Sequence, residues 1–304
     1  MTIPDEGLPP ERIIASLLRI PNSHRVFSLP IEALEKTHGI TIEIARELID
    51  AGIPFHAAAD GPLLDENDVA SASLYLRLPS ARRSMMTFWL RALHRLRTAH
   101  APSAHRVEVT AACPDPGHDG PCAYGVALDD GPRSVCRADR PESVRLGTLR
   151  TPPGGRPREL PTVVRDLLRD FHHVDYYRLP RETTRDSGFL RRTGMADCTL
   201  MARALVDEGL RHGLNARFAA GLIIAVPFST AHTWAEFEVD GAWLPADPLL
   251  PRALSAWGVP KAGDWPVTLA PNGLFHRLAG APRDMVTHAG RACGVSLRTR
   301  EEPS

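Results

Sequence analysis

Cys198 has the setting of a nucleophile. It follows Asp197 and opens an amphipathic stretch that ends at His212-Gly213. An aspartate oxygen can accept hydrogen bonds from the first N–H groups of a helix, and glycine readily ends one, so we predict a helix from Cys198 to about Arg211. The positive end of this helix favours a thiolate, and its free N–H groups can hold an oxyanion. The alternative is a small buried hydrophobic residue, as most free cysteines are.

A histidine and an aspartate are predicted to lie on one face of a hairpin. Residues 217–226 form a predicted strand, and the turn signal Asp240-Gly241 separates two more, 232–239 and 242–247. A two-residue turn would place Asp247 opposite Trp234 and diagonal to His232, with about 7–8 Å between backbones. This is the geometry of a base and its orienting carboxylate. The alternative is a pair of polar residues on a solvated sheet face.

Four short motifs occur in an order that resembles a known family. They are a cysteine at a helix start, Gly-x-x-Ala-Arg entering a strand, His-x-Trp opening the next, and Trp-x-x-x-Asp-Pro closing the hairpin. In this chain they are Asp197-Cys198, Gly213-Leu214-Asn215-Ala216-Arg217, His232-Thr233-Trp234 and Trp243-Leu244-Pro245-Ala246-Asp247-Pro248. Residues 194–249 thus resemble the transglutaminase-like core of the papain-like cysteine enzymes.

This resemblance implies an α+β fold with a papain-like core, in which the helix carrying Cys198 packs on an antiparallel sheet carrying the other two residues. It implies that Cys198 is the nucleophile, His232 the general base and acid, and Asp247 the orienting carboxylate. The reaction would be acyl transfer through a Cys198 acyl-thioester, and it needs no cofactor.

The family also recruits an oxyanion-hole side chain from upstream of the cysteine. No tryptophan lies between Trp89 and Trp234, so an indole donor close upstream is absent. Tyr176, Tyr177 and Thr193 are the alternatives, and the sequence does not choose among them.

The sequence does not determine which molecule accepts the acyl group. Amide-bond formation onto an amine is the preferred interpretation, with a peptide or a carrier-bound thioester or amide as donor. Hydrolysis by a cysteine peptidase or amidase is the first alternative. A catalytically inactive, transglutaminase-like binding module is the second, and the missing upstream indole favours it.

Composition is that of an ordinary globular protein, 43% hydrophobic and 24% charged over 304 residues. The formal net charge is zero, which argues against nucleic acid or an acidic membrane as partner. The N-terminal residues lack the apolar segment of a secretory signal, no apolar run has the length of a membrane span, and the cysteine number is odd. We therefore expect a cytoplasmic protein.

Periodicity divides the chain into three predicted parts. Residues 1–100 are expected to form a helical N-terminal lobe, 101–155 a small β region with a turn at Asp130-Gly131 and a Pro/Gly-rich linker, and 156–304 the catalytic domain. The last seven residues are predicted to be disordered.

Four residues of the β region offer a set of zinc ligands: Cys113, His118, Cys122 and Cys136. Their spacing lacks the C-x2-C pair typical of such sites. The sequence therefore favours a plain Pro/Gly loop with unremarkable thiols over a metal site.

Overall fold

A computed structural model describes residues 7–98, 103–115, 117–128, 133–139, 143–259 and 261–302. The chain forms two compact units, each assembled from three separate segments. The first unit comprises Met1–Leu90, Arg165–Glu208 and Asp247–Val267. The second comprises Arg91–Val164, Gly209–Ala246 and Thr268–Ser304.

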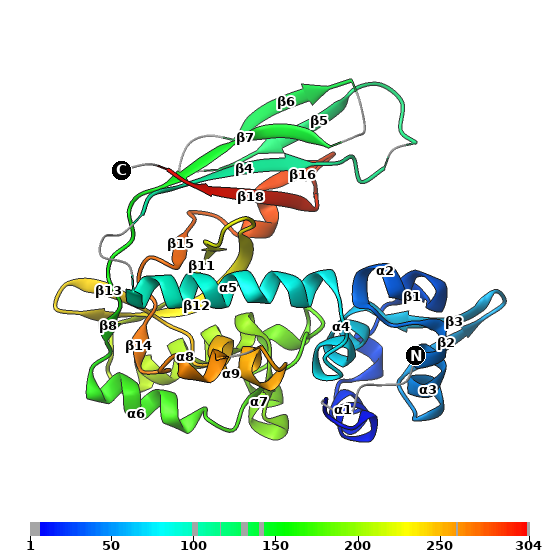
Figure 1. Ribbon diagram of the computed structural model, residues 1–304, viewed down its shortest axis with the longest axis horizontal. Helices are drawn as coiled ribbons and strands as arrows, with labels where there is room; N and C mark the ends of the chain where they lie inside the picture. Colours follow the sequence, from blue (N-terminus) through cyan, green and yellow to red (C-terminus); the bar gives the residue numbers. More distant parts are fainter. Residues whose placement is uncertain are drawn as a thin grey trace. The chain divides into compact units, whose positions relative to one another are not determined.

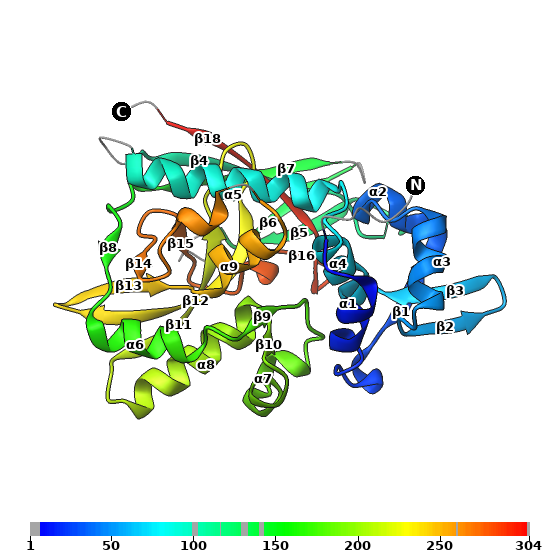
Figure 2. The ribbon, with the colours of Figure 1, turned by 60° about the horizontal axis from the view of Figure 1, so that its bottom comes forward.

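The first unit is built mainly from helices (Figures 1 and 2). Those lying wholly or mostly within it are α1 (Pro10–Leu17), α2 (Leu34–His38), α3 (Ile42–Asp50), α4 (Glu66–Tyr75), α6 (Thr162–Asp170), α7 (Ser187–Thr193), α8 (Cys198–Arg211) and α9 (Leu249–Ala256). The longest helix, α5 (Ala81–Thr98), contributes to both units. Short 3-10 turns of this unit are η1 (Asn22–His24), η2 (Ile31–Ala33), η3 (Thr183–Arg185) and η4 (Ala262–Asp264), while η5 (Pro282–Asp284) lies in the second unit.

Helix starts in this unit follow local capping rules. Thr41 Oγ1 accepts from the backbone N–H of Ile44 at the start of α3. Asp65 Oδ1 accepts from the N–H groups of Asn67 and Asp68 at the start of α4. Such contacts satisfy backbone donors that have no partner inside the helix.

The first unit also contains two small sheets. One is antiparallel with the order β1 (Phe27–Pro30), β3 (Gly61–Asp65), β2 (Phe55–Ala58), and the other pairs β9 (Asp175–Tyr176) with β10 (Met195–Ala196) in parallel. A buried ion pair, Arg25 Nε to Asp68 Oδ2 at 2.6 Å, joins the segment before β1 to α4. Arg25 also donates to the carbonyls of Leu17 and Ile20, so the guanidinium fixes the end of α1.

The second unit carries most of the strands. Its main sheets have the orders β13-β12-β11-β15, β17-β16-β5-β6 and β18-β4-β7, and β14 pairs with β8. The strands are β4 (His105–Ala111), β5 (Cys122–Val126), β6 (Ser134–Ala138), β7 (Val144–Thr151), β8 (Arg158–Glu159), β11 (Ala216–Ile223), β12 (Thr230–Val239), β13 (Ala242–Ala246), β14 (Leu269–Ala270), β15 (Phe275–Arg277), β16 (Val286–His288), β17 (Arg291–Ala292) and β18 (Val295–Glu301).

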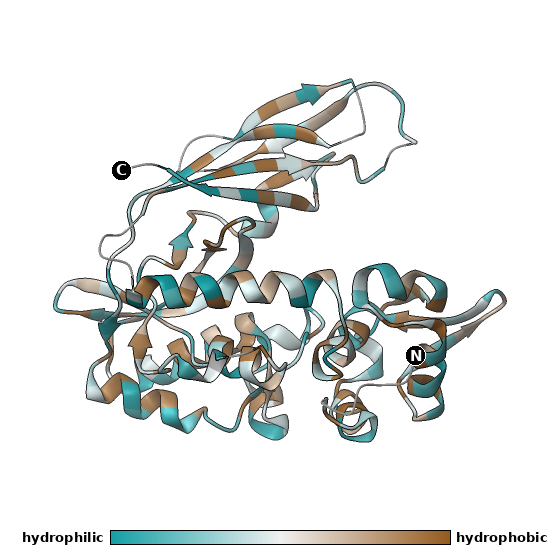
Figure 3. Ribbon diagram, viewed as in Figure 1, coloured by the Kyte–Doolittle hydropathy of each residue, from teal (hydrophilic) through white to brown (hydrophobic). Residues whose placement is uncertain are grey.

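One hydrophobic core joins these sheets. Strand β4 alternates buried and less buried positions, and Val107 and Val109 are fully buried (Figure 3 shows the matching alternation of colour). They pack with Tyr124 of β5, Leu222 of β11 and Leu297 of β18. Alternation with period two therefore directs one face of each strand into a shared interior.

The predicted α+β class is confirmed. The described residues form nine α-helices, and their sheets are antiparallel except for the β9–β10 pair. The papain-like packing, the N-terminal lobe and the three-part division stay predictions. The turn predicted at Asp130-Gly131 lies outside the described residues.

Disorder at the C-terminus was the wrong expectation for Arg298–Glu301. These residues belong to β18, which pairs with β4 over its whole length and supplies buried Leu297 and Thr299 to the interior. Polar composition alone did not reveal the pairing. Across the described part of the chain, no helix has both the length and the apolar character to cross a membrane.

Candidate functional site

Cys198 is the first residue of α8, as predicted, and its side chain is half-buried. The backbone N–H of Leu200 donates to Asp197 Oδ1 at 2.8 Å, which confirms Asp197 as the cap. At the other end Gly213 has φ +73°, and its N–H and that of Leu214 bond back to the last turn. This closure fixes the length of the helix and places the thiol at its positive end.

Of the three candidate side chains, Tyr176 is the best suited to donate a hydrogen bond to the oxyanion. Strand β9 pairs with β10, so Tyr176 lies beside Ala196, two residues before Cys198. Burial first, and then the charge of Cys198, raise the pKa of Tyr176 above its ordinary value. The phenol therefore keeps its proton and remains a donor.

The other two candidates have different roles. Tyr177 stacks on Tyr75 with ring centroids 4.9 Å apart. Thr193 Oγ1 donates to the carbonyl of Phe189 and accepts from the N–H of Met195. Tyr176 also packs on an aromatic ring, that of Trp257, with centroids 5.0 Å apart. It differs from Tyr177 in that the charge of Cys198 contributes to its raised pKa.

The carboxyl group of Asp197, beside the proposed nucleophile, has a raised pKa. Burial raises the pKa of Asp197 to about 6, and the Leu200 N–H and the positive charge of Arg178 only partly oppose this. The carboxyl group that caps α8 therefore has a pKa well above that of an ordinary aspartate.

His232 lies on β12 with its side chain buried against aromatic rings. Its ring centroid is 6.2 Å from that of Trp234, with planes 19° apart, and 5.2 Å from that of Phe275 on β15. His232 pairs with Gly221 on β11, and Trp234 pairs with Ala219. The predicted common face of His232 and Trp234 is therefore present.

Glu236 extends this face and was not singled out from the sequence. Trp234 Nε1 donates to Glu236 Oε1 at 3.1 Å, and Arg217 Nε donates to Glu236 Oε2 at 2.7 Å. The Arg217 guanidinium lies 3.9 Å above the ring of Trp243. The signal was the period of two, since positions 232, 234 and 236 alternate along one strand.

Asp247 directly follows β13. The predicted register is confirmed, because Val239 pairs with Ala242 and Ala235 with Ala246, where the ladder ends. Asp247 Oδ1 accepts from the N–H groups of Leu249 and Leu250 at 3.0 and 3.1 Å, so this carboxylate caps α9. Its role as orienter of His232 stays a prediction.

The three candidate catalytic residues are distributed over both units. Cys198 and Asp247 belong to the first unit, and His232 belongs to the second. The β12–β13 hairpin connects His232 covalently to the residue preceding Asp247. The catalytic assignment of all three stays a prediction.

A cavity of about 520 Å³ opens in the second unit beside the His232 face. Trp234, Glu236 and Phe275 line one wall. Residues 151–156 of the Pro/Gly-rich stretch 151–157, which was expected from sequence to be a linker, supply another wall together with Arg158. The walls mix aromatic, carboxylate and guanidinium groups, as in pockets that orient a ligand.

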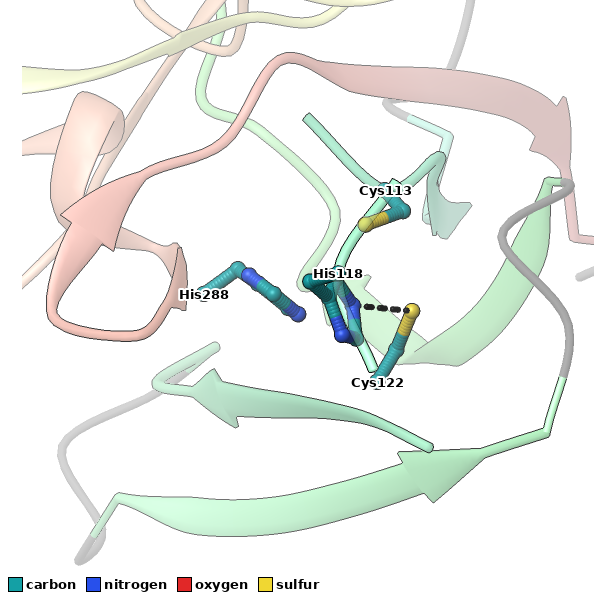
Figure 4. Close-up of side chains that lie close together, drawn as sticks. All are labelled: Cys113, His118, Cys122 and His288. Atoms are coloured by element: carbon teal, nitrogen blue, oxygen red, sulfur yellow. Dashed lines mark hydrogen bonds between the residues drawn. The ribbon is translucent and has the colours of Figure 1, made fainter. Parts of the chain in front are cut away.

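The loop expected to hold unremarkable thiols contains a cluster instead. Cys113, His118 and Cys122 come together with His288 of β16, and Cys136 is not in the group. Figure 4 shows these four side chains converging from the loop and from two strands.

Comparison with known proteins identifies one family. The model of the transglutaminase-like superfamily matches residues 156–248, a range that contains Cys198, His232 and Asp247. Neither a curated protein nor a solved structure matches the chain. A domain of this superfamily indicates cysteine-dependent acyl transfer or hydrolysis. Residues 156–248 therefore resemble the core of the transglutaminase-like superfamily.

Proposed function

We propose that the protein catalyses acyl transfer through a Cys198 acyl-thioester and forms an amide bond with an amine acceptor. The observation that carries this proposal is the position of Cys198 at the first residue of α8, within the matched domain. His232 would act as general base and acid, and Asp247 would orient its ring.

The reaction proceeds in two halves. The Cys198 thiolate attacks the donor carbonyl, and His232 protonates the leaving group as the carbon–leaving-group bond breaks, which leaves a thioester. The incoming amine then loses a proton to His232 and attacks the thioester carbonyl, and the thiolate departs. The first N–H groups of α8 and the hydroxyl of Tyr176 would stabilise the oxyanion in both halves.

The cavity beside the His232 face is our candidate for binding part of the substrate. Its wall includes Trp234 and Phe275, the two rings that pack against His232. A substrate group held there would lie next to the two rings that pack against the proposed base. If water replaced the amine, the same thioester would be hydrolysed, and the enzyme would be a peptidase or amidase.

Thiol reactivity tests the proposal. Cys136 is a matched internal control, because it is half-buried like Cys198 but lies on β6 rather than at a helix start. With iodoacetamide near neutral pH, peptide mass spectrometry should find Cys198 modified at least about tenfold faster than Cys136, since the thiolate is the reactive species.

His232→Asn should reduce the rate at Cys198 and leave the rate at Cys136 unchanged. Equal rates at the two thiols in the wild-type protein would contradict the proposal and favour a binding module.

A further inference from the structure

Four buried or half-buried side chains form a compact set of soft ligands in the second unit. They are Cys113, His118, Cys122 and His288, and one ligand atom from each lies within 4.8 Å of all the others (Figure 4). The cluster lies outside the stretch 156–248 that matches the family. It is therefore a feature that the proposed acyl transfer does not use.

Strand register explains why a distant histidine joins the loop. Strand β16 pairs with β5 so that His288 lies opposite Tyr124. Cys122 is two residues before Tyr124 on the same strand, so all three side chains point to one face. That face is buried, since Cys122 and Tyr124 are buried while Ala123 between them is exposed.

The loop between β4 and β5 supplies the remaining two groups. Cys113 follows the end of β4 at Ala111, and the chain returns through His118 to Cys122 at the start of β5. The ring of His118 lies 4.8 Å from that of His288, centroid to centroid. Two groups on a short loop therefore meet two groups fixed on paired strands.

The separations suit a tetrahedral zinc ion. Zinc binds thiolate at about 2.3 Å and imidazole at about 2.0–2.1 Å, so the ligand atoms of a tetrahedron lie roughly 3.3–3.8 Å apart. His118 Nε2 and Cys122 Sγ are 3.4 Å apart. The whole set lies within 4.8 Å, so small rotations of the side chains would close it around one ion.

The hydrogen bonding of His118 directs its Nε2 atom, the nitrogen that would bind the metal ion, toward the cluster. His118 Nδ1 lies 2.9 Å from the carbonyl oxygen of Asp119, which can only accept a hydrogen bond. Nδ1 must therefore carry the proton, and Nε2 directs its lone pair at Cys122. Metal-bound histidines are oriented in this way by a backbone carbonyl on the other nitrogen.

The surroundings indicate a structural site. Cys113, Cys122 and His288 are 8%, 3% and 9% exposed. Tyr124, whose ring centroid lies 5.4 Å from that of His288, is also fully buried. A site with four protein ligands and little solvent access leaves no open position for substrate.

We propose that Cys113, His118, Cys122 and His288 bind one structural zinc ion. Binding converts both thiols to thiolates and releases their protons, and it ties the loop after β4 to the β5–β16 sheet. The set differs from the one suggested by sequence, because His288 replaces Cys136. Cys136 lies opposite Tyr124 on β6, yet it is not among the four converging groups.

Metal analysis of the full chain tests this proposal. Protein purified under reducing conditions, incubated with Zn²⁺ and desalted should retain about one equivalent of zinc. Cys122→Ser and His288→Asn should lose most of it, while Cys136→Ser, the matched control, should retain it. Loss from Cys136→Ser equal to that from Cys122→Ser would overturn the assignment.

Cobalt substitution provides a readout that does not depend on the folding of a variant. Wild-type protein loaded with Co²⁺ should show the intense visible bands of a four-coordinate ion and a thiolate charge-transfer band. Folded wild-type protein that retains neither metal, or whose Cys113 and Cys122 are joined in a disulfide after purification under reducing conditions, would refute the site. Either result would leave the reactivity of Cys198 unaffected, so the two proposals fail independently.

Discussion

At the scale of single residues, Asp197 has two effects on the stability of α8. Its Oδ1 caps the helix through the Leu200 N–H, which stabilises the start of the helix. Burial raises its pKa to about 6, so carrying a charge at neutral pH costs free energy. The cap and the charge are separable, because asparagine caps helices about as well as aspartate.

Asp197→Asn should therefore gain stability relative to wild type as pH rises. A carboxyl with a folded pKa of about 6 and an ordinary value of 3.8 favours folding below about pH 4, and this contribution is lost as pH rises through about 6. Asparagine does not titrate, so the difference in the free energy of unfolding should move by about 1–3 kcal/mol in favour of the variant. Urea unfolding from about pH 4 to about pH 8 measures it.

Asp186→Asn is the control of opposite sign. Burial alone would raise the pKa of Asp186, but the Arg192 guanidinium and neighbouring N–H groups lower it overall. The free energy of unfolding of Asp186→Asn should therefore fall relative to that of wild type as pH rises from the acid range. A difference for Asp197→Asn that does not change with pH would disprove the account of Asp197.

At the scale of elements, the position of His232 depends on close packing of β11 between two strands. Gly221 pairs with His232 on one side and with Arg277 of β15 on the other. A Cβ at this glycine would lie 2.0 Å from the carbonyl oxygen of His276. The glycine thus lets β15 approach closely enough for Phe275 to pack on the His232 ring.

Gly221→Ala should displace β15 and loosen Phe275 from His232. We expect a loss of about 1–3 kcal/mol in the free energy of unfolding and a change in the NMR chemical shifts of the His232 ring. Gly280→Ala is the matched control, because a Cβ at that glycine would meet no described atom within 4 Å. Equal behaviour of the two variants would show that this close approach does not position the base.

At the scale of the whole molecule, local sequence signals predicted individual helices and strands. They did not predict the strand pairings and side-chain clusters formed by segments far apart in the chain. The bounds of α8 and the β12–β13 register follow from a capping aspartate, a terminal glycine and an Asp-Gly turn, all within a few residues. The inclusion of His288 in the thiol cluster depends on the pairing of β5 with β16, which no local pattern encodes. The pairing of β1 with β3 was missed for the same reason, whereas β2 and β3 form a local hairpin in which Ala58 pairs with Gly61.

The two-unit organisation also arises from long-range contacts. Each unit combines three stretches of chain. Cys198 and His232 lie in two consecutive stretches, Arg165–Glu208 and Gly209–Ala246, which belong to different units. The family resemblance could be recognised because its motifs are short and ordered. Glu236 could not be assigned a partner from sequence, because Arg217 lies on the neighbouring strand.

Capture of the acyl-enzyme tests the central claim most directly. Wild-type protein, Cys198→Ala and Cys136→Ala would be incubated with a panel of thioester and peptide donors, with and without added amines, and their intact masses measured. We predict an acyl adduct on wild type and Cys136→Ala, none on Cys198→Ala, and faster discharge by amine than by water. An adduct that persists in Cys198→Ala, or no adduct on wild type with any donor, would contradict the account.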